Sequence, residues 1–512
     1  MVIINQHDFP LLPSQEARRQ LVIARGAAGR ASSSSRRASR ATLNDLPDEL
    51  ILEILGYLPG INLDQFQLPT LLNLAFTSRR LYRVVIDKAY AQFDSHFCEP
   101  YLFLRTLISN SQLAELVNEV KIIFGQWTLR KDARHAPTAK DKKTIKEGLR
   151  SSDIPGWKDW ATECNEEGGS DEAVHNAILL YTPNVTSIGV QDFTSTPSQH
   201  PAWVDVISKA ALGAYGKTHR FEHLQSIKIH VRWSTLAQIA PLFRIQSLLI
   251  LHLGGLLECN MDTYTGDSGD TKRRSEHALK LQRLIPHGCN NIEELSLEHT
   301  YYSKRFLEVL VSSSRNLKAF KYEVSLDHLA AWEIPPETNS MPMINVLESQ
   351  KASLETLRVF CDAQAEEETH GEIHVRDGMT GFTSLKHLSC PLGMIMPECS
   401  ETFAEKLPPS LLTYQTTIRQ YTTDQKGIGA LEHMIACSQS HTPRLQEVQV
   451  VIPHSASWIK YNWEDLVQIS GEVGLGFRLE EEEEDTSGFS NSWRGGSIGS
   501  SRSSDEVDLY SD

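Results

Sequence analysis

One short pattern recurs along most of this chain. Three apolar residues are spaced h-x-x-h-x-h, just after a helical stretch and a turn residue. Apolar residues two apart point to the same face of a β-strand, so each copy predicts a short strand with one buried face. In a chain that is 40% hydrophobic such spacing arises by accident, but not repeatedly in the same position after a helix. The copies are Val117/Val120/Ile122, Val185/Ile188/Val190, Leu224/Ile227/Ile229, Ile245/Leu248/Ile250, Ile292/Leu295/Leu297, Leu317/Phe320/Tyr322, Leu354/Leu357/Val359, Leu385/Leu388/Cys390, Leu411/Tyr414 and Leu445/Val448/Val450.

A helix, a turn and a short strand, repeated along the chain, are typical of an α/β solenoid. The copies lie about 20 to nearly 70 residues apart, whereas regular leucine-rich repeats have periods of roughly 20–29 residues. We therefore expect an irregular solenoid over residues 100–479. Two polar insertions, near 130–170 and 257–275, are expected to form loops on its rim.

The two ends of the chain differ from this middle part in composition. Residues 1–41 are rich in Arg and Ser, with seven Arg against two acids, and residues 480–512 carry ten acids against two Arg. Such segments bury too little apolar surface to fold, so we expect a disordered basic arm and a disordered acidic Ser/Gly tail. Arg18 to Arg40 also has the composition of a transit peptide, although its Gly and Ser runs weaken any amphipathic helix.

Bulk properties restrict the class of protein further. The net charge of −15 disfavours nonspecific binding to nucleic acid. The eight Cys form no CxxC pair, which indicates reduced thiols in a cytoplasmic or nuclear protein, not a disulfide framework or a zinc site. No window approaches the roughly 18 uninterrupted apolar residues of a membrane span.

Residues 42–92 predict a separate helical module. Apolar residues at helical spacing begin at Leu46, Pro47 suits a first helical turn, and Pro59-Gly60 ends the helix. A second helix is expected around Leu71 to Ala75 after an extended loop, and a third is expected to begin at Ser78. A unit of this size carries more apolar surface than it can bury alone.

This module resembles an F-box. The resemblance rests on Leu46-Pro47-Asp48-Glu49-Leu50, on Ile54, Leu55 and Leu58, and on the segment LLNLAFTSRRLYRVV. The solenoid that follows resembles the degenerate leucine-rich repeats found after F-boxes in many fungal proteins. The resemblance implies a substrate-recognition adaptor of an SCF-type cullin-RING ubiquitin ligase, in which the F-box binds a Skp-type adaptor and, through it, a cullin. The residues expected to bind the adaptor are Leu46, Pro47, Leu50, Ile54, Leu55, Leu58, Leu72 and Leu74.

Sequence signals for catalysis are weak. Gly495-Gly496-Ser497-Ile498-Gly499 has the G-x-S-x-G form, but no strand precedes it and no helix follows it. The nineteen His show no metal-ligand spacing, and no phosphate-binding glycine loop occurs outside the basic arm. We therefore expect no enzyme activity, no cofactor and no metal, and an unidentified target protein as the second partner. A scaffold that acts outside any ligase remains the alternative.

Overall fold

The computed structural model describes residues 46–56, 64–124, 135–152, 154–166, 171–192, 200–215, 220–231, 234–258, 270–300, 302–324, 341–361, 373–374, 378–392, 403–417, 421–452 and 463–481. The chain divides into two compact units, Met1–Ala89 and Tyr90–Asp512. The basic arm predicted at residues 1–41 lies outside the described residues, as does the acidic tail from residue 482.

The described part of the first unit is helical. It contains α2 (Asp48–Gly56), α3 (Asp64–Thr77) and the greater part of α4 (Arg79–Tyr90). Three short helices were predicted here and are confirmed. The prediction of an extended loop up to the second helix is wrong in length, because α3 already begins at Asp64. The early start of α3 was not predicted because Pro69 lies within it, and proline inside a helix normally breaks the helix.

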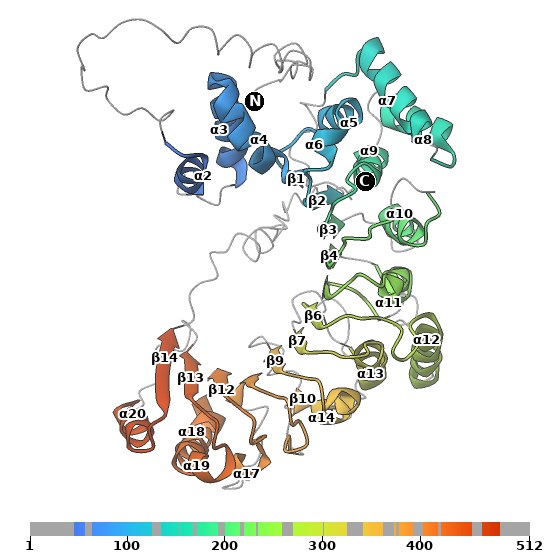
Figure 1. Ribbon diagram of the computed structural model, residues 1–512. Helices are drawn as coiled ribbons and strands as arrows, with labels where there is room; N and C mark the ends of the chain where they lie inside the picture. The colour runs from blue at the N-terminus through green and yellow to red at the C-terminus, as the bar shows by residue number, and fades with distance from the viewer. Residues whose placement is uncertain are drawn as a thin grey trace, which may run out of the picture. The chain divides into compact units, whose positions relative to one another are not determined.

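The second unit is built on one twelve-stranded sheet. Its strands lie side by side in the order in which they occur along the chain, and every pair is parallel (Figure 1). This arrangement confirms the predicted α/β solenoid. The strands are β1 (Gln92–Asp94), β2 (Glu119–Phe124), β3 (Ser187–Asp192), β4 (Ser226–Val231), β5 (Ile250–Gly254), β6 (Glu294–Glu298), β7 (Ala319–Val324), β9 (Thr356–Cys361), β11 (His387–Ser389), β12 (Thr413–Thr417), β13 (Glu447–Ile452) and β14 (Gly476–Glu481).

Helical segments connect most successive strands and lie along one side of the sheet (Figure 1). A separate two-stranded parallel pair joins β8 (Met341–Pro342) and β10 (Ile373–His374). The helical segments are α5 (Pro100–Ser109), α6 (Ser111–Ala114), α7 (Ala139–Ser151), α8 (Trp157–Asn165), α9 (Asp171–Leu180), α10 (Ala202–Ala211), α11 (Leu236–Ile239), η3 (Ala240–Arg244), α12 (Asp270–Leu284), α13 (Lys304–Ser312), α14 (Met343–Val346), η5 (Glu348–Gln350), α17 (Phe403–Lys406), α18 (Tyr421–Ala436), α19 (Ser438–His441) and α20 (Trp463–Glu472).

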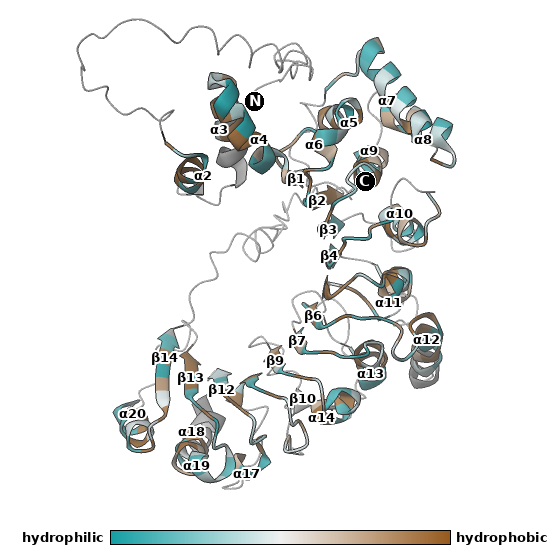
Figure 2. Ribbon diagram, in the orientation of Figure 1, coloured by the Kyte–Doolittle hydropathy of each residue, from teal (hydrophilic) through white to brown (hydrophobic). Residues whose placement is uncertain are grey.

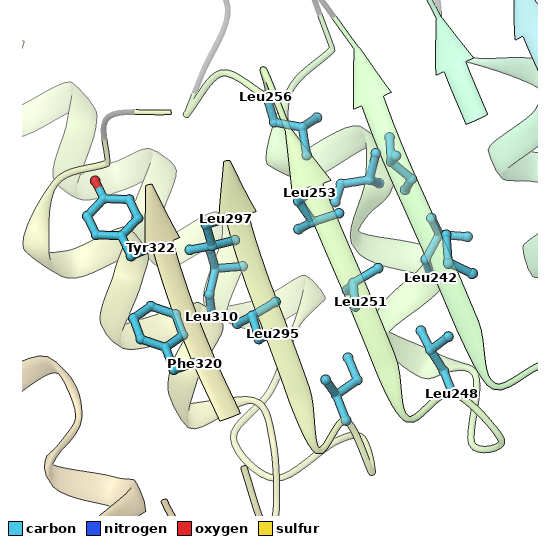
Figure 3. Close-up of a cluster of buried hydrophobic side chains, with 14 of the residues drawn as sticks. Leu242, Leu248, Leu251, Leu253, Leu256, Leu295, Leu297, Leu310, Phe320 and Tyr322 are labelled. Atoms are coloured by element: carbon cyan, nitrogen blue, oxygen red, sulfur yellow. The ribbon is translucent and has the colours of Figure 1, made fainter. Parts of the chain in front are cut away.

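The recurring apolar pattern forms the core of this unit. Its first residue lies two positions before a strand, and the other two point from the strand into the helical layer. Leu224, Ile227 and Ile229 of the β4 repeat, for example, are each at most 3% exposed. Figure 3 shows how equivalent leucines and aromatic residues line up across neighbouring strands: Leu251 and Leu253 of β5, Leu295 and Leu297 of β6, and Phe320 and Tyr322 of β7.

A backbone hydrogen-bond ladder accompanies the core. The carbonyl oxygen of the residue before one strand accepts two N–H groups at the start of the next strand, at 2.7–3.3 Å. These bonds satisfy backbone groups that would otherwise be orphaned between helix and strand, and they fix the register of each repeat on its neighbour. The accepting residues are Ala91, Asn118, Thr186, Gln225, Leu249, Glu293, Lys318, Glu355, Lys386 and Leu412.

One predicted copy is out of phase. Ile227 of β4 pairs with Leu251 of β5, so Ile245, Leu248 and Ile250 do not occupy the expected positions. The chain reads LLILHLGGLL here and is apolar at successive positions, so the pattern fits in more than one phase. The correct copy is Leu248, Leu251 and Leu253.

The insertion at 130–170 is not a rim loop. Two amphipathic helices, α7 and α8, occupy most of it and pack over α5 and α9. Ile145 and Leu149 of α7 are fully buried. Their spacing of four residues was a helical signal that the charged residues around it obscured. The second insertion is shorter than predicted, because α12 begins at Asp270.

Candidate partner-binding surface

Helix α2 carries two apolar stripes. Ile51 and Leu55 are four residues apart, so they share a helix face, and they are 1% and 4% exposed. Leu50 and Ile54 form a second stripe one position earlier and are 45% and 44% exposed, and Leu52 is 42% exposed. The first stripe therefore holds the helix in its unit, while the second remains accessible.

The N-terminus of α2 is held by α4. Arg80 donates to the carboxylate of Asp48 at 2.6 Å and also donates to the carbonyl oxygen of Leu46. Ser78 caps α4, because its hydroxyl oxygen accepts the N–H of Leu81 at 3.1 Å. The Arg80 contacts join two ends of the helical segment that lie more than thirty residues apart, and so they orient α2.

Helix α3 divides its apolar side chains in the same way. Leu71 and Ala75 are buried at 4% and 5% exposure, and Leu72 and Leu74 are half-buried. Phe76 is 41% exposed. Figure 2 shows hydrophobic residues on both α2 and α3.

Exposed apolar side chains are concentrated in the first unit. Among the described residues, eight large apolar side chains are more than 40% exposed, and four of them are Leu50, Leu52, Ile54 and Phe76. The first unit is much the smaller of the two, so this share is disproportionate. Clustered apolar exposure of this kind marks a surface that another protein covers.

Comparison with known families agrees with this surface. The F-box-like family model matches residues 43–93. The chain carries an F-box-like domain. No curated protein is similar enough to the chain to count as a match. F-box domains bind Skp-type adaptors. An exposed apolar surface on a small helical domain is consistent with binding of that kind.

The predicted contact residues of the F-box-like domain differ in accessibility. Pro47, Leu50 and Ile54 are exposed, and Leu50 and Ile54 share one stripe. Leu46, Leu72 and Leu74 are half-buried. Leu55 is buried, so it is placed to support α2 and not to meet a partner, and Leu58 lies outside the described residues. Which of these side chains bind the adaptor stays a prediction.

Sequence reasoning missed two exposed residues of the F-box-like domain, Leu52 and Phe76. Both lie beside residues that fitted the helical pattern of the buried face, so neither carried a signal of its own. A run of consecutive apolar residues, Leu50-Ile51-Leu52, exceeds what one buried stripe needs. This excess of apolar residues was the one sequence signal that α2 also has an exposed apolar face.

The described residues contain neither a metal-binding cluster nor a membrane-spanning helix. Within the described ranges, no group of three or more His, Cys, Asp or Glu is arranged to hold a metal ion. No helix in this part of the chain is long and apolar enough to cross a membrane. Histidines in the repeats have ordinary partners: His252 contacts Glu294 at 3.1 Å and His387 contacts Thr413 at 2.8 Å. The Gly495–Gly499 motif lies outside the described residues.

Proposed function

We propose that this chain is the substrate-recognition subunit of an SCF-type cullin-RING ubiquitin ligase. The exposed apolar stripe of α2, within a segment that matches the F-box-like family, carries the proposal. In this proposal the F-box-like domain binds a Skp-type adaptor that is attached to a cullin, and the second unit binds a target protein.

The exposed residues alone account for part of the adaptor affinity. Full burial of a large apolar side chain contributes about 1.5–3 kcal/mol. The four exposed side chains, Leu50, Leu52, Ile54 and Phe76, are already more than half buried. Association costs at least about 4 kcal/mol in lost freedom of motion. Pro47 and the half-buried Leu46, Leu72 and Leu74 therefore need to join the interface, as predicted from the sequence.

The repeats of the second unit support target binding. We assign them to the degenerate leucine-rich repeats of fungal F-box proteins, because Leu recurs at the first core position and the strands follow in strict order. The sheet face turned away from the core is polar. At one register position across the sheet it carries Lys121, Gly189, Lys228, His252, Ser296, Lys321, Arg358, Ser389, Gln415, Gln449 and Arg478.

No covalent chemistry is required of this chain. The assembled ligase raises the local concentration of the target near a ubiquitin-conjugating enzyme that carries ubiquitin, and this proximity accelerates ubiquitin transfer. In this proposal the chain is not an enzyme and works in the cytoplasm or the nucleus.

The test is a pull-down of the Skp-type adaptor and cullin by the full chain. The Leu50→Ser/Ile54→Ser variant should lose both proteins. Leu279→Ser/Val467→Ser should keep them, because it removes comparably exposed apolar side chains from the second unit. Circular dichroism confirms that each variant is folded.

Three outcomes are informative. If folded wild-type chain retains no adaptor, the adaptor role is wrong. If both variants bind as well as wild type, the stripe is not the contact surface. If the complex forms but transfers no ubiquitin to any bound protein, the chain is a scaffold that acts outside a ligase.

A further inference from the structure

The helical side of the second unit contains a groove that neither the adaptor contact nor the open sheet face uses. It has a volume of about 420 Å³, near the lower end of the roughly 300–1,000 Å³ that ligand sites occupy. Helices α8 and α10 form its walls and α9 its floor. The residues that decide its chemistry are Trp160, Glu163, Asn176, Asp205, Lys209 and Tyr215.

Two aromatic rings lie at one side of the groove. Trp160 of α8 and Tyr215, which follows α10, meet edge to face, with ring centroids 6.4 Å apart. Aromatic faces attract cations, and a planar guanidinium stacks on them better than an ammonium does.

The floor holds a buried amide. Asn176 of α9 is only 4% exposed, and its Oδ1 has no hydrogen-bond partner among the described residues. A buried amide oxygen without a donor is costly, so it favours a ligand that brings an N–H group.

The local charge is negative. Glu163 lines the groove and is exposed, whereas the second lining carboxylate, Asp205, is already bonded to Lys209 and to His200 at 2.9 Å each. Burial raises the pKa of the nearby Glu172 carboxyl, and the charges of Asp192 and Glu163 raise that pKa further. Carboxylates that repel one another in this way are stabilised by an added cation.

We propose that this groove binds an arginine side chain presented by the target protein. Guanidinium fits because it stacks on the aromatic pair while its several N–H groups donate to Glu163 and to Asn176. A metal ion fits less well, because no metal-holding group of carboxylates was found among the described residues. The inference rests on the proposed target-binding role of the second unit and names the chemistry of the target.

The experiment uses the full chain with ¹⁵N-labelled tryptophan and follows the indole N–H signals by NMR. The probe is butylguanidinium, and butylurea serves as an uncharged probe of the same shape. Butylguanidinium should shift the Trp160 signal saturably, and butylurea should bind at least about tenfold more weakly, as expected for loss of one charge-assisted contact. The Trp157 signal, from the same helix but outside the groove lining, should not move.

Two variants localise the effect. Glu163→Gln should weaken butylguanidinium binding about tenfold. Glu166→Gln makes the same charge change three residues further on, outside the groove lining, and should leave binding unchanged. Unchanged indole signals elsewhere show that each variant is folded.

Equal binding of the two probes, no saturable shift of Trp160, or equal losses in the two variants would each overturn the proposal. None of these results depends on the adaptor. Failure here is therefore distinguishable from failure of the F-box-like domain in the pull-down.

Discussion

Arg105 of α5 donates a hydrogen bond to Asp141 of α7 at 3.0 Å, and the two side chains are only 8% and 7% exposed. Asp141 also accepts bonds from His135 at 3.2 Å and from the hydroxyl of Thr138 at 2.7 Å. This carboxylate therefore completes the capping box that Thr138 begins at the start of α7, and it ties α7 to the first repeat of the solenoid. This contact explains how a strongly charged insertion is held against the helical layer.

Replacement of Asp141 by Asn should destabilise the second unit markedly. The change leaves the Arg105 guanidinium buried without its counter-charge, which typically costs about 3–5 kcal/mol. Urea unfolding followed by circular dichroism measures the loss. Glu147→Gln, on the exposed face of α7, is the matched control and should change stability by less than about 0.5 kcal/mol. Equal effects of the two variants would show that the buried pair does not anchor α7.

The same carboxylate predicts a pH dependence. Burial opposes its ionisation, but hydrogen bonds from Thr138, Arg105 and His135 outweigh that effect and hold the pKa of Asp141 well below its usual range. A lowered pKa in the folded state means that the stabilisation is present above the unfolded value of about 3.9 and is lost as pH falls toward the folded value.

Urea midpoints of wild type and Asp141→Asn, compared from pH 7 to pH 3, test this. The difference between the two proteins should be constant above about pH 5 and should shrink below about pH 4. Groups that make no contact with Asp141 cancel in this comparison. A difference that stays the same at pH 3 would contradict the assignment.

Gln350 should be another sensitive position. It is 3% exposed, its Nε2 donates to the carbonyl oxygens of Val311 and Ser314, and its Oε1 accepts the N–H of Leu317 at 3.1 Å. Gln350→Met keeps the volume but removes the partner of the Ser314 carbonyl and of the Leu317 N–H, so we expect a loss of at least about 2 kcal/mol. The Val311 carbonyl still accepts the N–H of Ser314. Thermal unfolding provides the measurement. The exposed Gln446→Met should have a small effect, and a similarly small effect of Gln350→Met would refute this role.

Two glycines should respond in opposite directions to the same substitution. Gly255 has φ +69°, and a Cβ there would collide with the carbonyl oxygen of Val231. Gly255→Ala should therefore destabilise by about 1–2 kcal/mol or more. Gly429 lies exposed within α18 with open space around it, so Gly429→Ala should stabilise by about 0.5–1 kcal/mol. Differential scanning calorimetry distinguishes the signs, and shifts of the same sign would contradict the local geometry.

The solenoid was predictable because its core repeats at fixed positions relative to each turn. Leu224 and Leu354 begin copies that show the pattern cleanly, since polar residues separate the apolar ones. The prediction failed in phase at β5, where apolar residues are consecutive. It missed β1, which has a single buried residue, Phe93, and it did not identify β14.

The candidate partner surface was predictable as a segment but not residue by residue. A helical pattern identifies α2, yet it does not say which of two adjacent stripes faces inward. Leu55 and Ile54 are adjacent in sequence, but Leu55 is buried at 4% exposure and Ile54 is 44% exposed. The contact between Arg80 and Asp48 orients α2, and a pairing between residues so far apart leaves no local signal in the sequence.

The hydrogen-bond ladder of the second unit stops at β14, which occupies one end of the sheet. An edge strand of this kind offers backbone groups on which the edge of a second molecule could assemble into a growing fibre. Glu480 and Glu481 lie on this strand, opposite Val451 and Ile452, and begin a run of five glutamates that ends at Glu484. Two copies whose last strands paired in parallel would bring these glutamates together, and the charge repulsion between them opposes such pairing.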